Sequence, residues 1–245
     1  LLWIAREVHG RIPPTALFAL PLAYSYPFQF GFVNFALSIG SVEDLVSNLY
    51  RRVVLIVAIT EENGEEQIAW YGSGTIISPN GLILTNAHVV LPDSETQIKD
   101  LAIFVTLAPE KSPELRYYAE VLQADVRLDL AVLRIVADAQ HQPIDPDTLY
   151  LPYVRLGDSD LLQLGDPIVI LGYPGIGGTT ITLTKGEVSG FTAEEGIDAR
   201  AFIKTSATIA GGNSGGLAAN SRGQLIGIPT RLGSGTEGEV VDCRW

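Results

Sequence analysis

The stretch GSGTIISPNGLILTNAHVV, residues 72–90, holds two short apolar runs separated by the turn sequence SPNG. Pro, Asn and Gly are the residues that β-turns favour, and apolar runs on both sides of such a turn indicate paired strands. Similar runs continue along the chain, from VVLIVAIT (residues 53–60) to QLIGIPTRL (residues 224–232). Many short strands with few helical patterns predict an all-β sandwich or barrel.

The composition is that of a folded protein, with 47% apolar and 18% charged residues. A formal net charge of −12 disfavours nucleic acid as a partner, because phosphate contacts need a basic face. Cys243 is the only cysteine, so no intrachain disulfide can form. Three histidines and one cysteine offer no zinc-ligand spacing, and we expect neither a metal nor a cofactor.

Residues 1–40 differ from the rest of the chain, and their role stays open. No charged residue occurs from position 12 to position 42, a run longer than a membrane-spanning helix needs. Prolines interrupt this run and oppose a single straight span. Arg6 and Arg11 before an apolar stretch also resemble a secretory signal. The segment is therefore membrane-related, signal-like or packed on the folded body through its aromatic residues.

The folded body is expected over residues 41–245. Ser41 and Asp44 form a capping-box pattern, followed by apolar residues at helical spacing, and predict a short helix at its start. Turn-forming residues are dense from Asp138 to Leu151. This loop is the expected boundary between two halves, at about residues 41–140 and 150–235.

Three short segments contain the residue types of nucleophilic catalysis: TNAHVV around His88, RLDLAVLRI around Asp129 and GGNSGG around Ser214. A serine hydroxyl becomes a good nucleophile when an imidazole takes its proton, and a carboxylate orients that imidazole. The order His, Asp, Ser along the chain is also the order of the chymotrypsin triad. We therefore predict His88 as general base, Asp129 as its orienting partner and Ser214 as nucleophile.

These segments resemble the trypsin-like peptidases, and within them the HtrA (Deg) branch, over about residues 41–232. ILGYPGIGGTTITLTKGEVSGF, residues 170–191, resembles the activation-loop strand pair of that branch. The resemblance implies a chymotrypsin-like double six-stranded β-barrel with short helices. In that branch a peptide-binding PDZ domain usually follows the protease, and residues 1–245 contain none.

The same resemblance implies a serine endopeptidase that cleaves polypeptides, unfolded proteins among them, through an acyl-enzyme. A homo-oligomer and a periplasmic, secreted or membrane-associated location are expected by analogy. Membrane association would run through residues 1–40. The alternative function is a catalytically silent peptide-binding module that keeps the protease fold.

The oxyanion hole is expected at Gly212 and Ser214, because glycines allow close approach of backbone N–H groups to a substrate oxygen. The resemblance also implies a substrate pocket, and none of its predicted residues is acidic. We therefore expect small or medium aliphatic residues before the cut rather than Arg or Lys. The predicted pocket residues are Thr208, Ile209, Gly227, Ile228, Pro229 and Thr230.

At two positions this sequence differs from other proteins of the family it resembles. Asn213 stands where many digestive relatives have the aspartate that pairs with a new N-terminus. The resemblance therefore implies that activation depends on ordering of the glycine-rich loop at residues 175–180. Pro229 departs from the usual residue of the HtrA branch and cannot donate a strand hydrogen bond.

Overall fold

The computed structural model describes residues 48–92, 96–175, 178–194, 197–230 and 239–242. The apolar segment 1–40 and most of the predicted helix at residues 41–51 lie outside the described residues. The part of that helix that is described ends in the 3₁₀ turn η1 (Tyr50–Arg52), which leads directly into the first strand.

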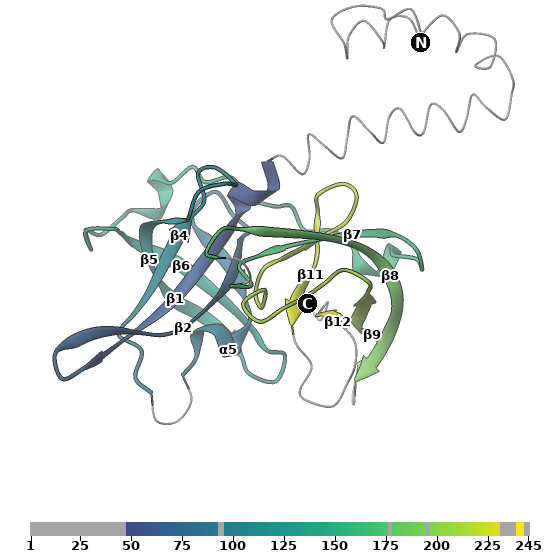
Figure 1. Cartoon of the computed structure of the whole chain (residues 1–245), viewed down its shortest axis with the longest axis horizontal. Coiled ribbons are helices and arrows are strands. Elements are labelled where there is room, and N and C mark those ends of the chain that lie inside the picture. Colours follow the sequence, from purple (N-terminus) through teal and green to yellow (C-terminus); the bar gives the residue numbers. More distant parts are fainter. Residues whose placement is uncertain (1–47, 93–95, 176–177, 195–196, 231–238, 243–245) are drawn as a thin grey trace, which may run out of the picture. The chain divides into compact units, whose positions relative to one another are not determined.

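The first half of the folded body is a closed six-stranded barrel (Figure 1). Its strands pair in the order β1-β2-β3-β6-β5-β4, and every pair is antiparallel. A short helix, α5 (Ala87–Val90), follows β3. The strands are β1 (Val53–Glu62), β2 (Glu65–Ile76), β3 (Leu82–Thr85), β4 (Asp100–Val105), β5 (Glu114–Asp125) and β6 (Leu130–Asp138).

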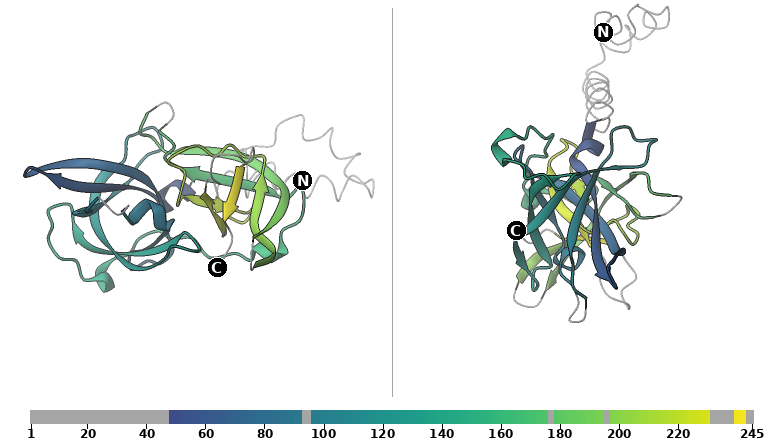
Figure 2. Two further views of the ribbon diagram at one scale, coloured as in Figure 1. Left: turned by 90° about the horizontal axis from the view of Figure 1, so that it is seen from below. Right: turned by 90° about the vertical axis from the view of Figure 1, so that its left-hand side faces the viewer.

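The second half is another closed six-stranded barrel, with the order β10-β11-β12-β9-β8-β7. Figure 2 shows the two barrels from two further directions. The predicted all-β double barrel of the chymotrypsin type is therefore confirmed. The strands are β7 (Pro167–Gly172), β8 (Thr182–Glu194), β9 (Ile197–Thr205), β10 (Leu217–Ala219), β11 (Leu225–Thr230) and β12 (Glu239–Asp242).

The connection between the barrels runs from residue 139 to residue 166 and contains two 3₁₀ turns, η2 (Pro146–Thr148) and η3 (Ser159–Leu161). The second barrel extends beyond residue 235, where we expected it to end. The reason is β12, which pairs with β9 on one side and β11 on the other and so closes the barrel.

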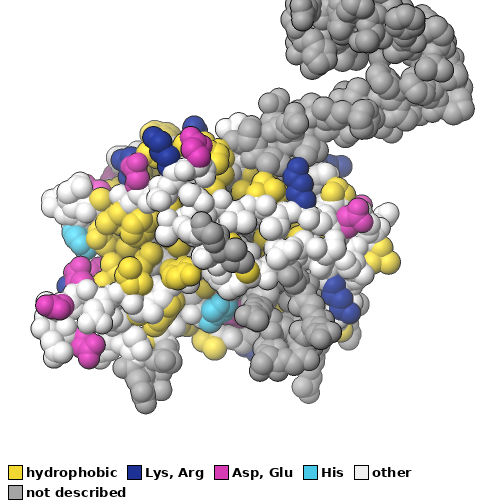
Figure 3. All heavy atoms as spheres, viewed as in Figure 1, with side chains coloured by type: hydrophobic (Ala, Val, Ile, Leu, Met, Phe, Trp, Pro, Cys, Tyr) yellow, Lys and Arg dark blue, Asp and Glu magenta, His cyan; other side chains and the backbone are white. Residues whose placement is uncertain are grey.

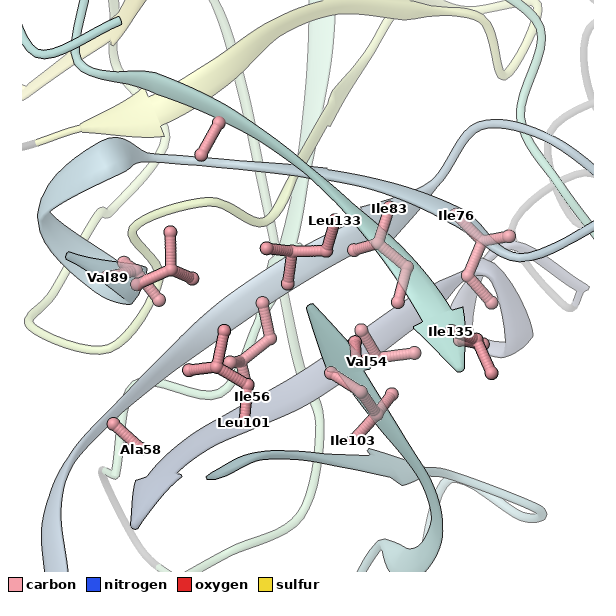
Figure 4. Close-up of a cluster of buried hydrophobic side chains, with 13 residues drawn as sticks. Val54, Ile56, Ala58, Ile76, Ile83, Val89, Leu101, Ile103, Leu133 and Ile135 are labelled. Carbon is pink, nitrogen blue, oxygen red and sulfur yellow. The ribbon is translucent and has the colours of Figure 1, made fainter. Parts of the chain in front are cut away.

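Alternation along the strands divides the apolar side chains between three cores. On β1, Val54, Ile56 and Ala58 point into the first barrel (Figure 4), whereas Val53 and Leu55 face outward. A strand presents successive side chains to opposite faces, so one strand serves two cores. Strand β7 repeats the arrangement: two isoleucines fill the second barrel, and Val169 and Leu171 face the first.

The outward-facing residues of both barrels form one shared core. It contains Val53 and Leu84 of the first barrel and Leu171, Leu217 and Leu225 of the second. Burying one such side chain contributes about 1.5–3 kcal/mol relative to leaving it exposed. The contact between the barrels is therefore a buried apolar core rather than a loose domain interface.

No helix in the described ranges has the length and apolar character that crossing a membrane requires.

Candidate active site

His88 lies on helix α5, directly after the buried strand β3. Asn86 has an extended backbone and begins the helix, and Leu91 N donates to Ala87 O at 2.8 Å at its end. The indole Nε1 of Trp70, on β2, donates to the carbonyl oxygen of Val89 at 2.8 Å. The short helix is thus fixed to the wall of the first barrel, and the His88 side chain remains half exposed.

The His88 ring contacts the carboxylate of Asp129, as the sequence predicts. Nδ1 lies 2.8 Å from Oδ2 and 3.0 Å from Oδ1 of Asp129. The backbone N–H of His88 also donates to Oδ1 at 3.0 Å. Because an ionised carboxylate only accepts hydrogen bonds, this pair places the proton on Nδ1. Nε2 then carries the lone pair that a general base needs.

Asp129 sits in a strained backbone conformation between β5 and β6, with φ of +52°. Aspartate is one of the few residues other than glycine that enter this region. Nδ2 of Asn86 donates to Asp129 O at 2.9 Å, and Thr230 Oγ1 donates to Oδ2 at 3.4 Å. Thr230, which is also a predicted pocket residue, therefore contacts the carboxylate.

Two opposing effects act on the pKa of Asp129. Burial raises the pKa, but the hydrogen bonds and charge attraction from His88 outweigh burial, and the pKa lies below its ordinary value of 3.8. Asp129 is therefore ionised at neutral pH and stabilises a protonated His88 ring.

Ser214 follows a tight turn at residues 210–213, which is closed by a hydrogen bond of 3.0 Å from Asn213 N to Ala210 O. Gly212, the third residue of the turn, has φ of +97°, which is the type II form. In the type I form this φ is negative and the central peptide is turned over. The sign at Gly212 therefore sets the direction of its own N–H group.

The backbone of Ser214 is held by the first barrel, because Ser73 N donates to Ser214 O at 2.8 Å. In the described part of the chain, the N–H groups of Gly212 and Ser214 make no hydrogen bond. No hydrogen bond joins the His88 ring to the Ser214 hydroxyl among these residues either. Catalytic hydrogen bonds of this kind are often long in the substrate-free enzyme and shorten when substrate binds.

The two glycines after Ser214 are required by close packing. A Cβ on Gly215, whose φ is +83°, would lie 2.1 Å from both Ser73 O and Thr85 Oγ1. A Cβ on Gly216 would lie 2.3 Å from Leu171 O. The chain beyond the predicted nucleophile therefore passes directly against both barrels.

The other predicted pocket residues occupy different environments of the second barrel. Thr208 is exposed and its carbonyl accepts from Thr184 Oγ1 at 2.8 Å, while Ile209 packs partly against the core of the barrel. On β11, Gly227 and Ile228 are buried, and Ile228 belongs to the shared core. Pro229 O accepts from Gly215 N at 3.2 Å, which links β11 to the segment after Ser214.

A hollow of about 590 Å³ lies beside His88 on the first barrel, and sequence reasoning missed it. Figure 3 shows apolar side chains gathered over this barrel. No local sequence pattern indicates this hollow, because its lining residues come from three separate segments. They are Trp70, Ala87, His88, Leu91, Pro92, Val126 and Asp129.

The predicted activation loop contacts the first barrel at both ends. A Cβ on Gly175, whose φ is +67°, would lie 2.3 Å from Tyr71 Oη, and Thr179 Oγ1 donates to Ser112 Oγ at 3.0 Å. Residues 176 and 177 lie outside the described ranges.

Asn213, which stands where many digestive relatives have an aspartate, is buried. Across the described segments, no three His, Cys, Asp or Glu side chains are grouped as metal ligands.

Known proteins are similar to this chain in sequence. The chain is 34% identical over 182 residues to a Chlamydia trachomatis protein named as a DegP-like periplasmic serine endoprotease, a match covering 74% of this chain and 32% of that protein. It is 39% identical over 173 residues to a Synechocystis sp. protein named as a serine protease, HhoA. That match covers 69% of this chain and 38% of the Synechocystis protein. A DegP-like protein of Brucella suis is 35% identical over 183 residues, covering 72% and 30%.

The chain spans about a third of the length of these relatives. A family model described as a trypsin-like peptidase domain matches residues 72–228, a range that contains His88, Asp129 and Ser214. With its two closed barrels and this match over more than half of its length, the chain belongs to the family of trypsin-like peptidase domains.

Proposed function

We propose that this protein is an HtrA-like serine endopeptidase that hydrolyses peptide bonds through an acyl-enzyme at Ser214. The observation that carries the proposal is the contact of His88 Nδ1 with both carboxylate oxygens of Asp129, at 2.8 and 3.0 Å. It gives the ring the tautomer in which Nε2 takes the proton of the serine hydroxyl. The Ser214 oxygen then bonds to the scissile carbonyl carbon.

The N–H groups of Gly212 and Ser214 stabilise the oxyanion of the tetrahedral intermediate. Protonated His88 gives its proton to the leaving amine, and the acyl group stays on Ser214. Water then attacks the ester with His88 as base again, and the acid product leaves. The type II turn at residues 210–213 supports this role, because it fixes the direction of the Gly212 N–H group.

The substrates are polypeptides, unfolded proteins among them, with small or medium aliphatic residues before the cut. The predicted pocket residues Thr208, Ile209 and Thr230 support this preference, because none of them carries an acidic group that could pair with Arg or Lys. The hollow beside His88, which Trp70 and Leu91 line on the first barrel, offers a separate apolar surface to the substrate chain. The relatives named as periplasmic support a periplasmic or secreted location.

The test combines labelling with cleavage. A fluorophosphonate probe should modify Ser214 of the wild type, and His88→Ala and Ser214→Ala should abolish labelling while circular dichroism shows both variants folded. Unfolded casein should be cut by the wild type alone, after Val, Ala or Leu when the fragments are mapped by mass spectrometry.

Two results would contradict parts of this proposal. Cuts after Arg or Lys would overturn the predicted preference. A folded wild type that neither reacts with the probe nor cuts casein would favour the silent peptide-binding module. In that case fluorescence anisotropy should detect binding of labelled unfolded casein.

A further inference from the structure

Ser73 connects the segments that carry the proposed catalytic groups. It lies on β2 between two glycines and is completely buried. Its backbone N–H donates to Ser214 O at 2.8 Å, and its carbonyl oxygen accepts from Thr85 Oγ1 at 2.7 Å. Thr85 ends the strand that leads to helix α5 and His88. The backbone of Ser73 thus links the base and nucleophile segments.

The Ser73 hydroxyl makes two further hydrogen bonds, and their directions are fixed. Tyr173 N donates to Ser73 Oγ at 2.9 Å, and Ser73 Oγ donates to Gly212 O at 2.7 Å. A hydroxyl has a single proton, so accepting from Tyr173 leaves that proton for Gly212. One buried side chain of the first barrel therefore holds the turn before Ser214 in the second barrel.

The carbonyl that Ser73 holds belongs to the peptide after Gly212, and the N–H proposed for the oxyanion belongs to the peptide before it. Holding the carbonyl restricts rotation about Gly212, whose backbone also packs tightly against Tyr173 O. We propose that Ser73 is a positioning residue that locks the turn at residues 210–213 in its type II form, with the Gly212 N–H directed at the substrate oxygen.

This inference rests on the proposed function for its catalytic meaning, whereas the lock itself is a property of the fold. Ser73→Ala removes only the hydroxyl and leaves Gly212 O and Tyr173 N without a partner. A larger residue is a poor test, because a Cβ on Gly172 would already lie 2.9 Å from Ser73 Oγ. Thr106→Val is the matched control: it removes another buried hydroxyl, one that bonds Tyr173 Oη at 2.8 Å.

The first measurement is steady-state hydrolysis of a peptide substrate. Loss of one oxyanion-hole donor lowers kcat by about 10²–10³-fold. In Ser73→Ala the donor is still present and points the wrong way only part of the time, so kcat should fall by less. We expect kcat of Ser73→Ala to fall about 10- to 100-fold with KM nearly unchanged. A peptide boronate forms a tetrahedral adduct that resembles the intermediate. Its inhibition constant should rise by about the same factor as kcat falls. Thr106→Val should change neither value.

The second measurement is hydrogen exchange followed by mass spectrometry, which needs no activity. Ser73→Ala should speed exchange in the segment 206–216, which contains the turn amide of Asn213, and Thr106→Val should not. Unchanged exchange would overturn the lock, and faster exchange with unchanged kcat would overturn its role in catalysis. A folded wild type that shows no hydrolysis would instead refute the proposed function, while exchange still decides whether Ser73 holds the turn.

Discussion

The side-chain Nδ2 of Asn86 donates a hydrogen bond of 2.9 Å to the backbone oxygen of Asp129. Asn86 precedes the helix that carries His88, so this one amide joins the backbones of the two residues whose side chains form the His–Asp pair. The bond also holds Asp129 in a conformation with positive φ, which strand residues rarely adopt.

Replacing Asn86 by alanine should weaken both stability and catalysis. Asn86 is fully buried, and without its amide the part-buried backbone oxygen of Asp129 would lose its partner, which costs about 1–3 kcal/mol. We expect urea unfolding to report a loss of that size and kcat/KM to fall about tenfold, equivalent to about 1.4 kcal/mol. Asn220→Ala, which removes an acceptor for two turn amides of the second barrel, is the control. Equal kcat/KM in both variants would make Asn86 purely structural.

A Cβ at Gly212 should be far more damaging than one at the neighbouring Gly211. The Gly212 Cβ would lie 2.3 Å from Tyr173 O in a conformation with φ of +97°, whereas nothing lies within 4 Å of a Cβ on Gly211. We expect Gly212→Ala to lower kcat at least about 100-fold, as loss of an oxyanion donor does, and Gly211→Ala to keep near wild-type activity. Similar losses in the two variants, measured with a peptide substrate, would contradict this assignment.

The lowered pKa of Asp129 predicts an acid-dependent contribution to stability. Its folded-state pKa is below the ordinary value of 3.8, so the contribution is present above that pH and is lost as pH falls through the folded-state pKa. Urea midpoints of the wild type should therefore fall more steeply in acid than those of Asp129→Asn. Asp147→Asn removes an exposed carboxylate and controls for net charge. Parallel curves for wild type and Asp129→Asn would disprove the effect.

Tyr173 predicts the opposite dependence at alkaline pH. Burial raises its pKa from 10.0 to about 12, although the Thr106 hydrogen bond acts against this rise. The protonated phenol stabilises the fold fully below pH 10, and this contribution is lost as pH rises towards 12. Tyr173→Phe should be less stable at neutral pH but lose less stability between these values, as followed by circular dichroism. Tyr150→Phe, at an exposed position, should lose as much stability over this pH range as the wild type does.

The sequence was sufficient for the barrels and for the His88–Asp129 contact. Turn residues at regular intervals separate strands whose apolar positions alternate. These signals are local, so they can be read without knowing which residues are neighbours in space. His88 and Asp129 each lie next to a predicted strand, and β3 and β6 turn out to be paired, so their ends bring the two side chains together.

Other features depend on contacts that leave no local signal. Ser73 and Gly212 are 139 positions apart, and in the sequence Ser73 is only a small residue between two glycines. Strand β10 has three residues, too few to show a period. Aspartate can adopt the positive φ seen at position 129, but the partner that holds it there, Asn86, lies 43 positions away in the sequence. Ile228 was expected at the substrate, but β11 turns its side chain into the shared core.

The core shared by the two barrels has a mechanical consequence. Moving the two halves apart would expose to water every side chain of this core. These side chains are Val53 and Leu84 of one barrel and Leu171, Leu217 and Leu225 of the other. The two halves therefore move as one body, and the spacing between the groups they carry is set when the chain folds.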